Sequence, residues 1–168
     1  MARQAISIVR LDLHHVAHVQ ALRSLLREYA LSTEGGGTPL SEQALERLPG
    51  LLASRPHYMA WLAHDPTSAS ASFIGLLNAF EGMSTFKARP LLNIHDIIVT
   101  ADWRGRGVGR ALIEAAQTYA KSRDCCKLTL EVLEGNTRAI GLYRSAGFDP
   151  YELDPAMGRA MFFEKWLD

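Results

Sequence analysis

Cysteine, long apolar runs and net charge are all scarce in this sequence. Cys125 and Cys126 are the only cysteines among 168 residues, and two adjacent thiols in an apolar stretch favour reduced side chains over a disulfide framework or a zinc site. No apolar run reaches the roughly 20 residues that a membrane helix needs, and the N-terminus lacks a secretion-signal pattern. Lys plus Arg and Asp plus Glu both total 18, so no broad basic field invites nucleic acid or an anionic membrane. These absences predict a cytoplasmic protein without a metal, nucleic-acid or membrane partner.

Residues that build a packed core are present in ordinary amounts. Hydrophobic residues make up 48% of the chain and charged residues 21%, which at this length favours one domain over residues 1–168. Strand and helix periodicities alternate along the chain. Strands are expected at residues 5–9, 58–63, 72–80, 91–99 and 128–132, and helices from Asp12, from Ser41, at 108–119 and at 137–145. Residues 151–153 and 160–167 are expected to form a terminal hairpin. This order predicts one mixed α/β domain.

Local signals predict how the first two helices begin and end. Asp12 is expected to cap the first helix with its carboxylate, and the second helix to end near Pro49 and Gly50. Between them, residues 32–39 hold three consecutive glycines, which favour a flexible loop. That loop is either a lid over a binding site or a linker between helices. Among the histidines of the first helix, His14 and His18 have the spacing of a metal-binding pair, but we expect an ordinary surface helix there.

A glycine-rich turn follows the strand expected at residues 91–99. Residues 104–110 read RGRGVGR, and glycines before a helix allow backbone N–H groups and the helix dipole to surround an anion. Arg104, Arg106 and Arg110 add three cations; the alternative is a plain turn with solvated arginines. The spacing does not fit a dinucleotide fold, because Arg110 takes the place of the third glycine. A P-loop is also excluded, because no G-K-[ST] follows. The turn does match the pattern R/Q-x-x-G-x-G/A.

Two motifs together resemble the GNAT superfamily of acyl-CoA-dependent N-acyltransferases. The first is the R/Q-x-x-G-x-G/A turn, and the second is LEVLEGNTRAIGLYRSAGF at residues 130–148. The second motif most resembles that of the ribosomal-protein alanine acetyltransferase branch, whereas the N-terminal half carries no motif of that branch. The resemblance implies a single-domain α/β fold with a mixed, mostly antiparallel sheet flanked by helices. It also implies an N-acetyltransferase that moves the acetyl group of acetyl-CoA directly to a primary amine of a small molecule or peptide.

The resemblance assigns binding residues for acetyl-CoA, the acyl donor. The strand backbone would hold the pantetheine arm and the glycine turn the pyrophosphate, and Asn136 and Tyr143 would add contacts. The cofactor-binding residues implied are Ile97, Ile98, Val99, Arg104, Gly105, Arg106, Gly107, Val108, Gly109, Arg110, Asn136 and Tyr143. Asn136 also precedes a helix, where it is well suited to act as an N-cap.

Acyl transfer to an amine needs a proton acceptor, an oxyanion donor and a proton for the departing thiolate. The resemblance makes Tyr143 the general acid and Glu131 a base candidate. In an alternating strand, the side chains of Leu130 and Glu131 point to opposite faces. A carboxylate inside a central strand needs a solvated cleft or a partner. A backbone N–H near Ile98 is the expected oxyanion donor, provided that its strand splays from the next.

Other assignments stay open at the level of the sequence. Asp96 competes with Glu131 as the catalytic base, His95 and Glu81 are further options, and water alone is another. The rival functions are a catalytically weak CoA-binding sensor or interaction module, a transferase for another acyl-CoA, and a nucleotide-binding regulatory domain. A homodimer is also expected as an option, because residues 160–167 present a strand edge that can pair.

Overall fold

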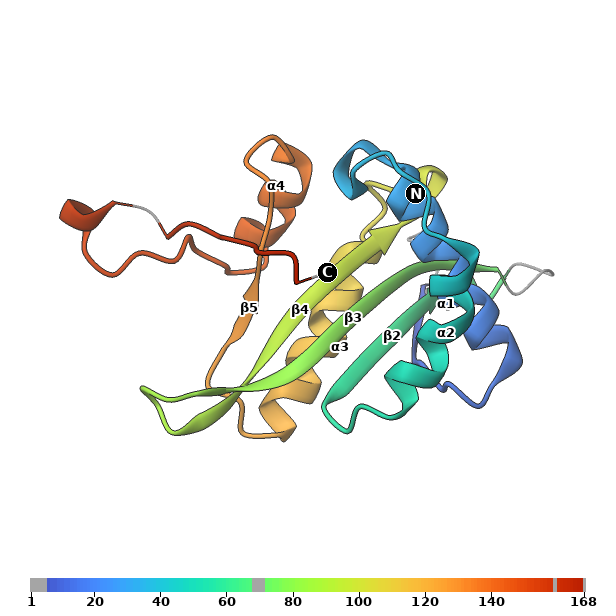
Figure 1. Ribbon diagram of the computed structural model, residues 1–168, viewed down its shortest axis with the longest axis horizontal. Coiled ribbons are helices and arrows are strands. Elements are labelled where there is room, and N and C mark those ends of the chain that lie inside the picture. The colour runs from blue at the N-terminus through green and yellow to red at the C-terminus, as the bar shows by residue number, and fades with distance from the viewer. Residues whose placement is uncertain (1–5, 68–71, 159, 168) are drawn as a thin grey trace.

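A five-stranded sheet forms the centre of the computed structural model, which describes residues 6–67, 72–158 and 160–167 (Figure 1). Its strands are β1 (Ser7–Arg10), β2 (Tyr58–His64), β3 (Phe73–Ser84), β4 (Arg89–Val99) and β5 (Leu128–Leu130). They lie in the order β1-β2-β3-β4-β5, and every neighbouring pair is antiparallel except β4 and β5, which are parallel. The expected mixed, mostly antiparallel sheet is confirmed.

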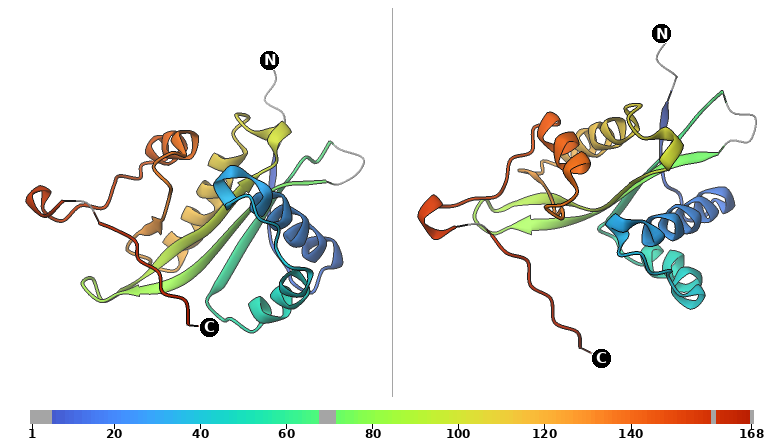
Figure 2. Two further views of the ribbon diagram at one scale, coloured as in Figure 1. Left: turned by 45° about the horizontal axis from the view of Figure 1, so that its top comes forward. Right: turned by 90° about the horizontal axis from the view of Figure 1, so that it is seen from above.

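Helices cover both faces of this sheet (Figure 2). The helices are α1 (Val16–Leu31), α2 (Glu42–Ala53), α3 (Val108–Ser122) and α4 (Thr137–Ser145), with short 3-10 turns at Thr33–Gly35, Ala101–Trp103 and Pro155–Met157. Leu76 packs with α1 and α2, whereas its neighbour Leu77 packs with α3 on the opposite face. This alternation along β3 gives the molecule two apolar clusters, one on each side of the sheet. Within the described residues, no helix is both long and apolar enough to span a membrane.

The first helix begins later than the sequence predicts. Its N-cap is His15, and the Asp12 carboxylate instead accepts a hydrogen bond from the backbone N–H of His14 at 2.8 Å. The Asp12 carboxylate therefore stabilises a local turn before the helix. Short polar side chains often form such turns instead of capping a helix. The prediction that Asp12 caps this helix is wrong.

The second helix continues through Pro49 to Ala53, so the prediction that it ends near Pro49 and Gly50 is also wrong. Pro49 has no N–H for the carbonyl of Leu45, one turn earlier. Arg23 of α1 replaces that donor, because its Nε lies 3.0 Å from the Leu45 carbonyl oxygen. A guanidinium from the neighbouring helix thus allows a proline inside α2. The predicted start is confirmed, since the Ser41 hydroxyl accepts a hydrogen bond from the Ala44 N–H.

An irregularity in β4 places its side chains on particular faces. Asn78 of β3 pairs with Asp96, but the next residue, Ala79, pairs with Ile94, so His95 is an extra residue in β4. Because of this bulge, Ile94 and Ile97 both pack on the α3 face. Asp96 faces the other side.

The predicted terminal hairpin does not form among the described residues. Neither Tyr151–Leu153 nor residues 160–167 are strands; the 3-10 turn at Pro155–Met157 and the left-handed Gly158 lie between them. This geometry sends the final segment away from the sheet instead of back along its partner (Figure 2). The expected strand at residues 5–9 is β1 from Ser7, and residue 5 lies outside the described part.

Candidate active site

A cleft of about 680 Å³ opens where β4 and β5 separate. The two strands pair only from Leu92 and Leu128 to Ile94 and Leu130, while β4 runs on to Val99. The expected splay is therefore present, and along the cleft the edge of β4 has no strand beside it in the described chain. The other walls come from the glycine turn, the segment from β5 into α4, the end of α1 with its 3-10 turn, and Phe162 of the C-terminal segment. Most of the predicted site residues meet here; Asp96 and Arg106 do not line the cleft.

The glycine turn has the backbone geometry that an anion cradle requires. Gly105 and Gly107 have φ of 73° and 89°, a left-handed conformation that side chains other than glycine rarely adopt. Gly107 is the N-cap of α3 and supplies no side-chain hydrogen bond. The N–H groups of the first turn of α3 are thus open to an anionic ligand, with the positive helix end behind them.

Gly109 has a different task in the same turn. A Cβ there would lie 2.8 Å from Leu142 Cδ2 of α4. The missing side chain lets α4 approach α3, which brings Tyr143 and Asn136 to the cleft.

The three arginines of the turn are used in three different ways. Arg104 lines the cleft, and its Nε donates to the carbonyl oxygen of Val99 at 3.0 Å. Arg110 also lines the cleft, but its guanidinium donates to the backbone and hydroxyl oxygens of Ser145, both at 2.7 Å. Arg106 lies outside the lining, with its guanidinium 5.2 Å from the centre of the Trp103 ring. The sequence therefore predicts more positive charge free to bind a ligand at this turn than the structure provides. It does not show which arginines bind other parts of the fold.

Tyr143 places a buried phenol in the cleft wall. Its residue surface is 7% exposed, and its ring centre lies 5.9 Å from that of Phe148. Burial, together with the nearby Tyr29, raises the pKa of Tyr143 to about 12. At neutral pH the hydroxyl is therefore a proton-bearing hydrogen-bond donor. The predicted cap is confirmed beside it, since Asn136 Oδ1 accepts from the Ala139 N–H at 3.1 Å.

Glu131 lies in the cleft, but not inside a central strand as expected. β5 ends at Leu130 and is an edge strand, and Glu131 is exposed just after it. Strand alternation predicts the position only up to the point where pairing stops, and the splay stops it here. The carboxylate lies in the cleft wall without the desolvation that a strand interior would impose.

Asp96 belongs to a polar chain on the α1–α2 face of the sheet, outside the cleft lining. It lies close enough to Tyr29 that burial, and then its charge, raise the pKa of that phenol. The hydroxyl of Tyr58 donates to Asn78 Oδ1 at 2.8 Å, and Asn78 Nδ2 donates to Asp96 Oδ2 at 3.0 Å. Burial, then the negative charge of Asp96, raises the pKa of Tyr58. The position of Asp96 as a candidate base is corrected, because the bulge at His95 turns its side chain away from the cleft lining. His95 does line the cleft, whereas Glu81 lies outside it and faces Arg123 and His57.

Sequence analysis misses several cleft residues, among them Tyr29, Glu34, Arg138 and Phe162. Tyr29 is half-buried near the end of α1, and Glu34 lies in the glycine-rich stretch expected to form a flexible loop. In the structure that stretch begins with an ordered 3-10 turn, in which the Ser32 hydroxyl accepts from the Gly35 N–H at 3.1 Å. Ser32 is a favourable N-cap residue, so the sequence could have predicted that turn. No local feature of the sequence indicates the direction of the Glu34 side chain.

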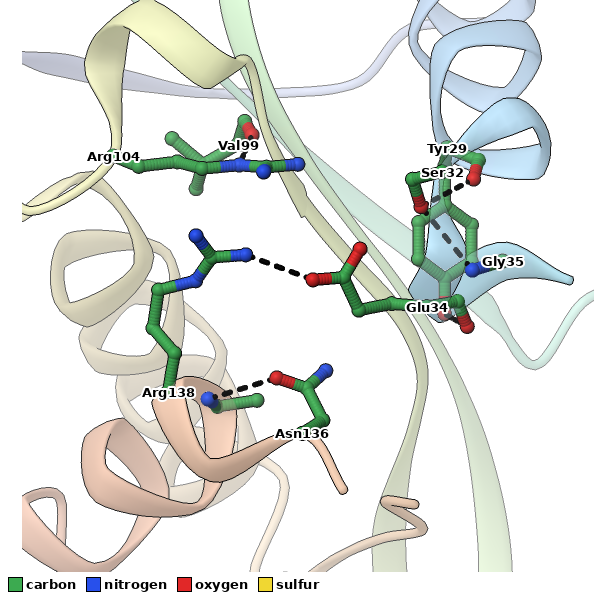
Figure 3. A network of polar contacts seen from close by, with 9 residues as sticks. Tyr29, Ser32, Glu34, Gly35, Val99, Arg104, Asn136 and Arg138 are labelled. Carbon is green, nitrogen blue, oxygen red and sulfur yellow. Dashed lines mark hydrogen bonds and ion pairs between the residues drawn. The ribbon is translucent and has the colours of Figure 1, made fainter. Parts of the chain in front are cut away.

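Glu34 crosses the cleft to α4. Its Oε1 lies 2.9 Å from a guanidinium nitrogen of Arg138 (Figure 3). A hydrogen bond from its own backbone N–H, the Ser32 hydroxyl, and the charges of Arg104 and Arg138 lower the pKa of Glu34. An ionised carboxylate from the α1–α2 connection thus faces Arg104 and Arg138. In the described chain, no group of three or more His, Cys, Asp or Glu side chains is arranged to hold a metal ion.

Comparisons with known proteins agree with this geometry. The family described as the acetyltransferase (GNAT) family matches residues 20–148, which include the glycine turn, the splayed strands and α4. An aminoglycoside acetyltransferase from an uncultured soil metagenomic sample, crystallised with trehalose, superposes with a TM-score of 0.76 at 18% identity, covering 97% of both chains.

Two curated relatives are similar over shorter stretches. An uncharacterized N-acetyltransferase of Methanocaldococcus jannaschii is 41% identical over 71 residues, 42% of this chain and 31% of the relative. Streptothricin acetyltransferase of Streptomyces lavendulae is 39% identical over 83 residues, 49% of this chain and 44% of the relative. The matches thus span less than half the length of these curated relatives.

Proposed function

The chain belongs to the acetyltransferase (GNAT) family, and on that premise we propose that it transfers the acetyl group of acetyl-CoA directly to a primary amine. The observation that carries the proposal is the cleft between the splayed β4 and β5, which ends at left-handed glycines and an uncapped helix N-terminus. The relatives' names support the coarse acceptor class, because an acetyltransferase for streptothricin and one for aminoglycosides both act on amine-bearing molecules.

The residues present fit CoA. The N–H groups of residues 108–110 and the Arg104 guanidinium would bind the pyrophosphate, and the open edge of β4 at residues 97–99 would bind the pantetheine amides. A Cβ at Gly105 or Gly107 would force a strained left-handed backbone in this cradle. When bound, acetyl-CoA supplies an acetyl group activated as a thioester.

The proton transfers are assigned to Tyr143 and Glu131. The amine nitrogen forms a bond to the acetyl carbon as the carbon–sulfur bond breaks. Tyr143 directs its hydroxyl proton to the departing sulfur, with the transfer coupled to bond breaking because a phenol of raised pKa is a weaker acid than a thiol. Glu131 accepts the proton that the amine loses, through a water molecule. The N–H of Ile98 is the proposed donor to the developing oxyanion.

The likeness of residues 130–148 to the ribosomal-protein alanine acetyltransferase branch supports these assignments for Glu131, Asn136 and Tyr143. It does not extend to the acceptor wall, which is built from Tyr29 and Glu34 in the half of the chain without that motif. We assign a cationic amine to this wall, because the Glu34 carboxylate attracts positive charge there.

The decisive experiment measures CoA release from acetyl-CoA with pooled polyamines, amino acids, aminoglycosides and short peptides, followed by mass spectrometry. The expected result is CoA release with one acceptor made heavier by a single acetyl group. Acetyl-CoA binding without release in any pool would favour a sensor, and release only from a longer acyl-CoA would favour another donor. Tight binding of ATP or NAD without CoA binding would favour a nucleotide-binding regulatory domain.

Gly107→Asp tests the pyrophosphate cradle. A side chain and a negative charge at this left-handed position should weaken CoA binding by more than about tenfold, measured by titration calorimetry. Gly36→Asp is the matched control, because Gly36 also has a left-handed φ, of 95°, but lies outside the cleft lining. Equal CoA affinity in the two variants would refute the assignment of the turn.

A further inference from the structure

Two guanidinium groups and one carboxylate come together in the cleft. Arg104 follows the 3-10 turn before α3, Arg138 lies in the first turn of α4, and Glu34 lies in the 3-10 turn after α1. All three residues line the cleft. Figure 3 shows both guanidinium groups reaching toward the side of the cleft from which Glu34 comes. Three segments far apart in the sequence thus bring opposite charges to one place.

Glu34 is held at both its side chain and its backbone. Its Oε1 lies 2.9 Å from a guanidinium nitrogen of Arg138, and its side chain is only 28% exposed. The Tyr29 hydroxyl donates to the Glu34 carbonyl oxygen at 3.4 Å, and the Ser32 hydroxyl accepts from the Gly35 N–H at 3.1 Å. A carboxylate that is partly shielded from water on an ordered turn attracts a cation more strongly than one on a solvated loop.

Both guanidinium groups lie beside residues that the proposed function gives to the donor. Arg104 Nε donates to the carbonyl oxygen of Val99 at 3.0 Å, which keeps its positive charge beside the glycine turn. Arg138 follows Asn136, the N-cap of α4, by two residues. A guanidinium binds carboxylates and phosphates through the same fork of N–H groups, so one anion can take the place of the other.

The ion pair between Glu34 and Arg138 is poorly placed to serve stability alone. The Arg138 side chain is 58% exposed, and an ion pair with so exposed a partner contributes little to folding. The pair also spans the cleft, so a ligand that fills the cleft must meet it. The carboxylate therefore occupies a place that an anionic group of the ligand can take.

On the premise that the cleft binds CoA, as in the proposed function, we propose that Glu34 is a built-in competitor of the donor. In the empty cleft, its carboxylate takes the place of a phosphate at Arg138. On donor binding, Arg138 exchanges this carboxylate for a phosphate group of CoA. Glu34 therefore weakens donor binding, and Arg138 is a donor-binding residue. The exchange also frees the Glu34 carboxylate for the cationic amine, because the two groups share the acceptor wall.

Titration calorimetry with CoA measures the competition. Glu34→Gln should bind CoA about three- to tenfold more tightly than the wild type, because Arg138 no longer has to leave a carboxylate. Glu42→Gln is the matched control, since Glu42 pairs with Arg27 on the surface, outside the cleft lining, and it should bind CoA like the wild type. Equal or weaker CoA binding by Glu34→Gln, with a circular dichroism spectrum that shows it folded, would overturn the proposal.

A double-mutant cycle separates exchange at Arg138 from a general effect of negative charge. Arg138→Gln should weaken CoA binding by about tenfold, because a cation that binds phosphate is lost. Adding Glu34→Gln to this variant should then give a gain in affinity at least about twofold smaller than in the wild-type background. The same gain in both backgrounds would overturn the exchange and leave CoA binding by the cleft intact. A wild-type chain that binds no CoA would instead refute the proposed function.

Discussion

At the scale of single residues, the cleft places groups of opposite character against each other. The ionised Glu34 crosses toward Arg138, whereas burial raises the pKa of the neutral Tyr143 phenol to about 12. Each group has a substitution that removes its chemistry and keeps its size, so the roles proposed for them can be measured one at a time.

Tyr143→Phe should lower turnover on the order of 10²-fold with CoA affinity nearly unchanged, because only the proton for the departing thiolate is lost. The rates and CoA affinities are compared with those of Tyr119→Phe. Tyr119 packs against Trp61 and lies outside the cleft lining, so its variant should match the wild type. A Tyr143→Phe rate equal to the wild-type rate across pH would assign the proton to water.

Glu34→Gln should raise KM for a cationic amine by about tenfold, with a smaller change in kcat, because an attractive charge is lost from the acceptor wall. Glu42→Gln is the control, since Glu42 pairs with Arg27 on the surface, outside the cleft lining. An unchanged KM in Glu34→Gln would mean that the carboxylate only holds Arg138.

At the scale of secondary-structure elements, contacts between neighbouring helices override the helix ends that the local sequence predicts. The clearest case is α2, which continues through Pro49 because Arg23 donates to the carbonyl that proline leaves without a partner. Local sequence rules predict that the helix ends at Pro49, because they contain no information about a guanidinium on another helix.

Arg23→Ala should therefore lower the free energy of unfolding by about 1–3 kcal/mol, because it leaves the buried Leu45 carbonyl unpaired. Urea unfolding measures the change. Arg27→Ala is the matched control on the same helix; its ion pair with Glu42 is exposed, and such pairs contribute about 0–1 kcal/mol. Equal losses in the two variants would contradict the role given to Arg23.

Much of the site was predictable because its signals are local. The turn with Gly105 and Gly107 and the cap at Asn136 depend on neighbouring residues, and both are found as expected. The positions of Asp96 and Glu131 depend on the bulge at His95 and on the point where β5 stops pairing. Those features come from pairing between strands far apart in the sequence, which strand alternation cannot supply.

At the scale of the whole molecule, two largely buried phenols share one property. Burial and Tyr29 raise the pKa of Tyr143 to about 12, and burial and Asp96 raise the pKa of Tyr58. In both places the fold favours a neutral phenol over a phenolate. The folded state as a whole should therefore be sensitive to alkali.

The sign of that sensitivity follows from proton linkage. The pKa of Tyr143 is higher in the folded state, about 12, than the value of 10 in the unfolded state. Stability is therefore unaffected below about pH 10. It falls as pH rises from 10 toward 12, because the unfolded state loses the phenol proton first. For Tyr143, the rise in pKa from 10 to about 12 corresponds to a loss of at most about 2–3 kcal/mol in the free energy of unfolding. Urea unfolding between about pH 9 and pH 12 measures this loss of stability. Tyr143→Phe should lose less stability over this range than the wild type, by up to this amount. Tyr119→Phe keeps the Tyr143 phenol and should therefore lose more stability than Tyr143→Phe. Parallel losses in all three proteins would mean that the Tyr143 hydroxyl reaches water in the folded state, and it could then donate to the departing sulfur only in competition with solvent.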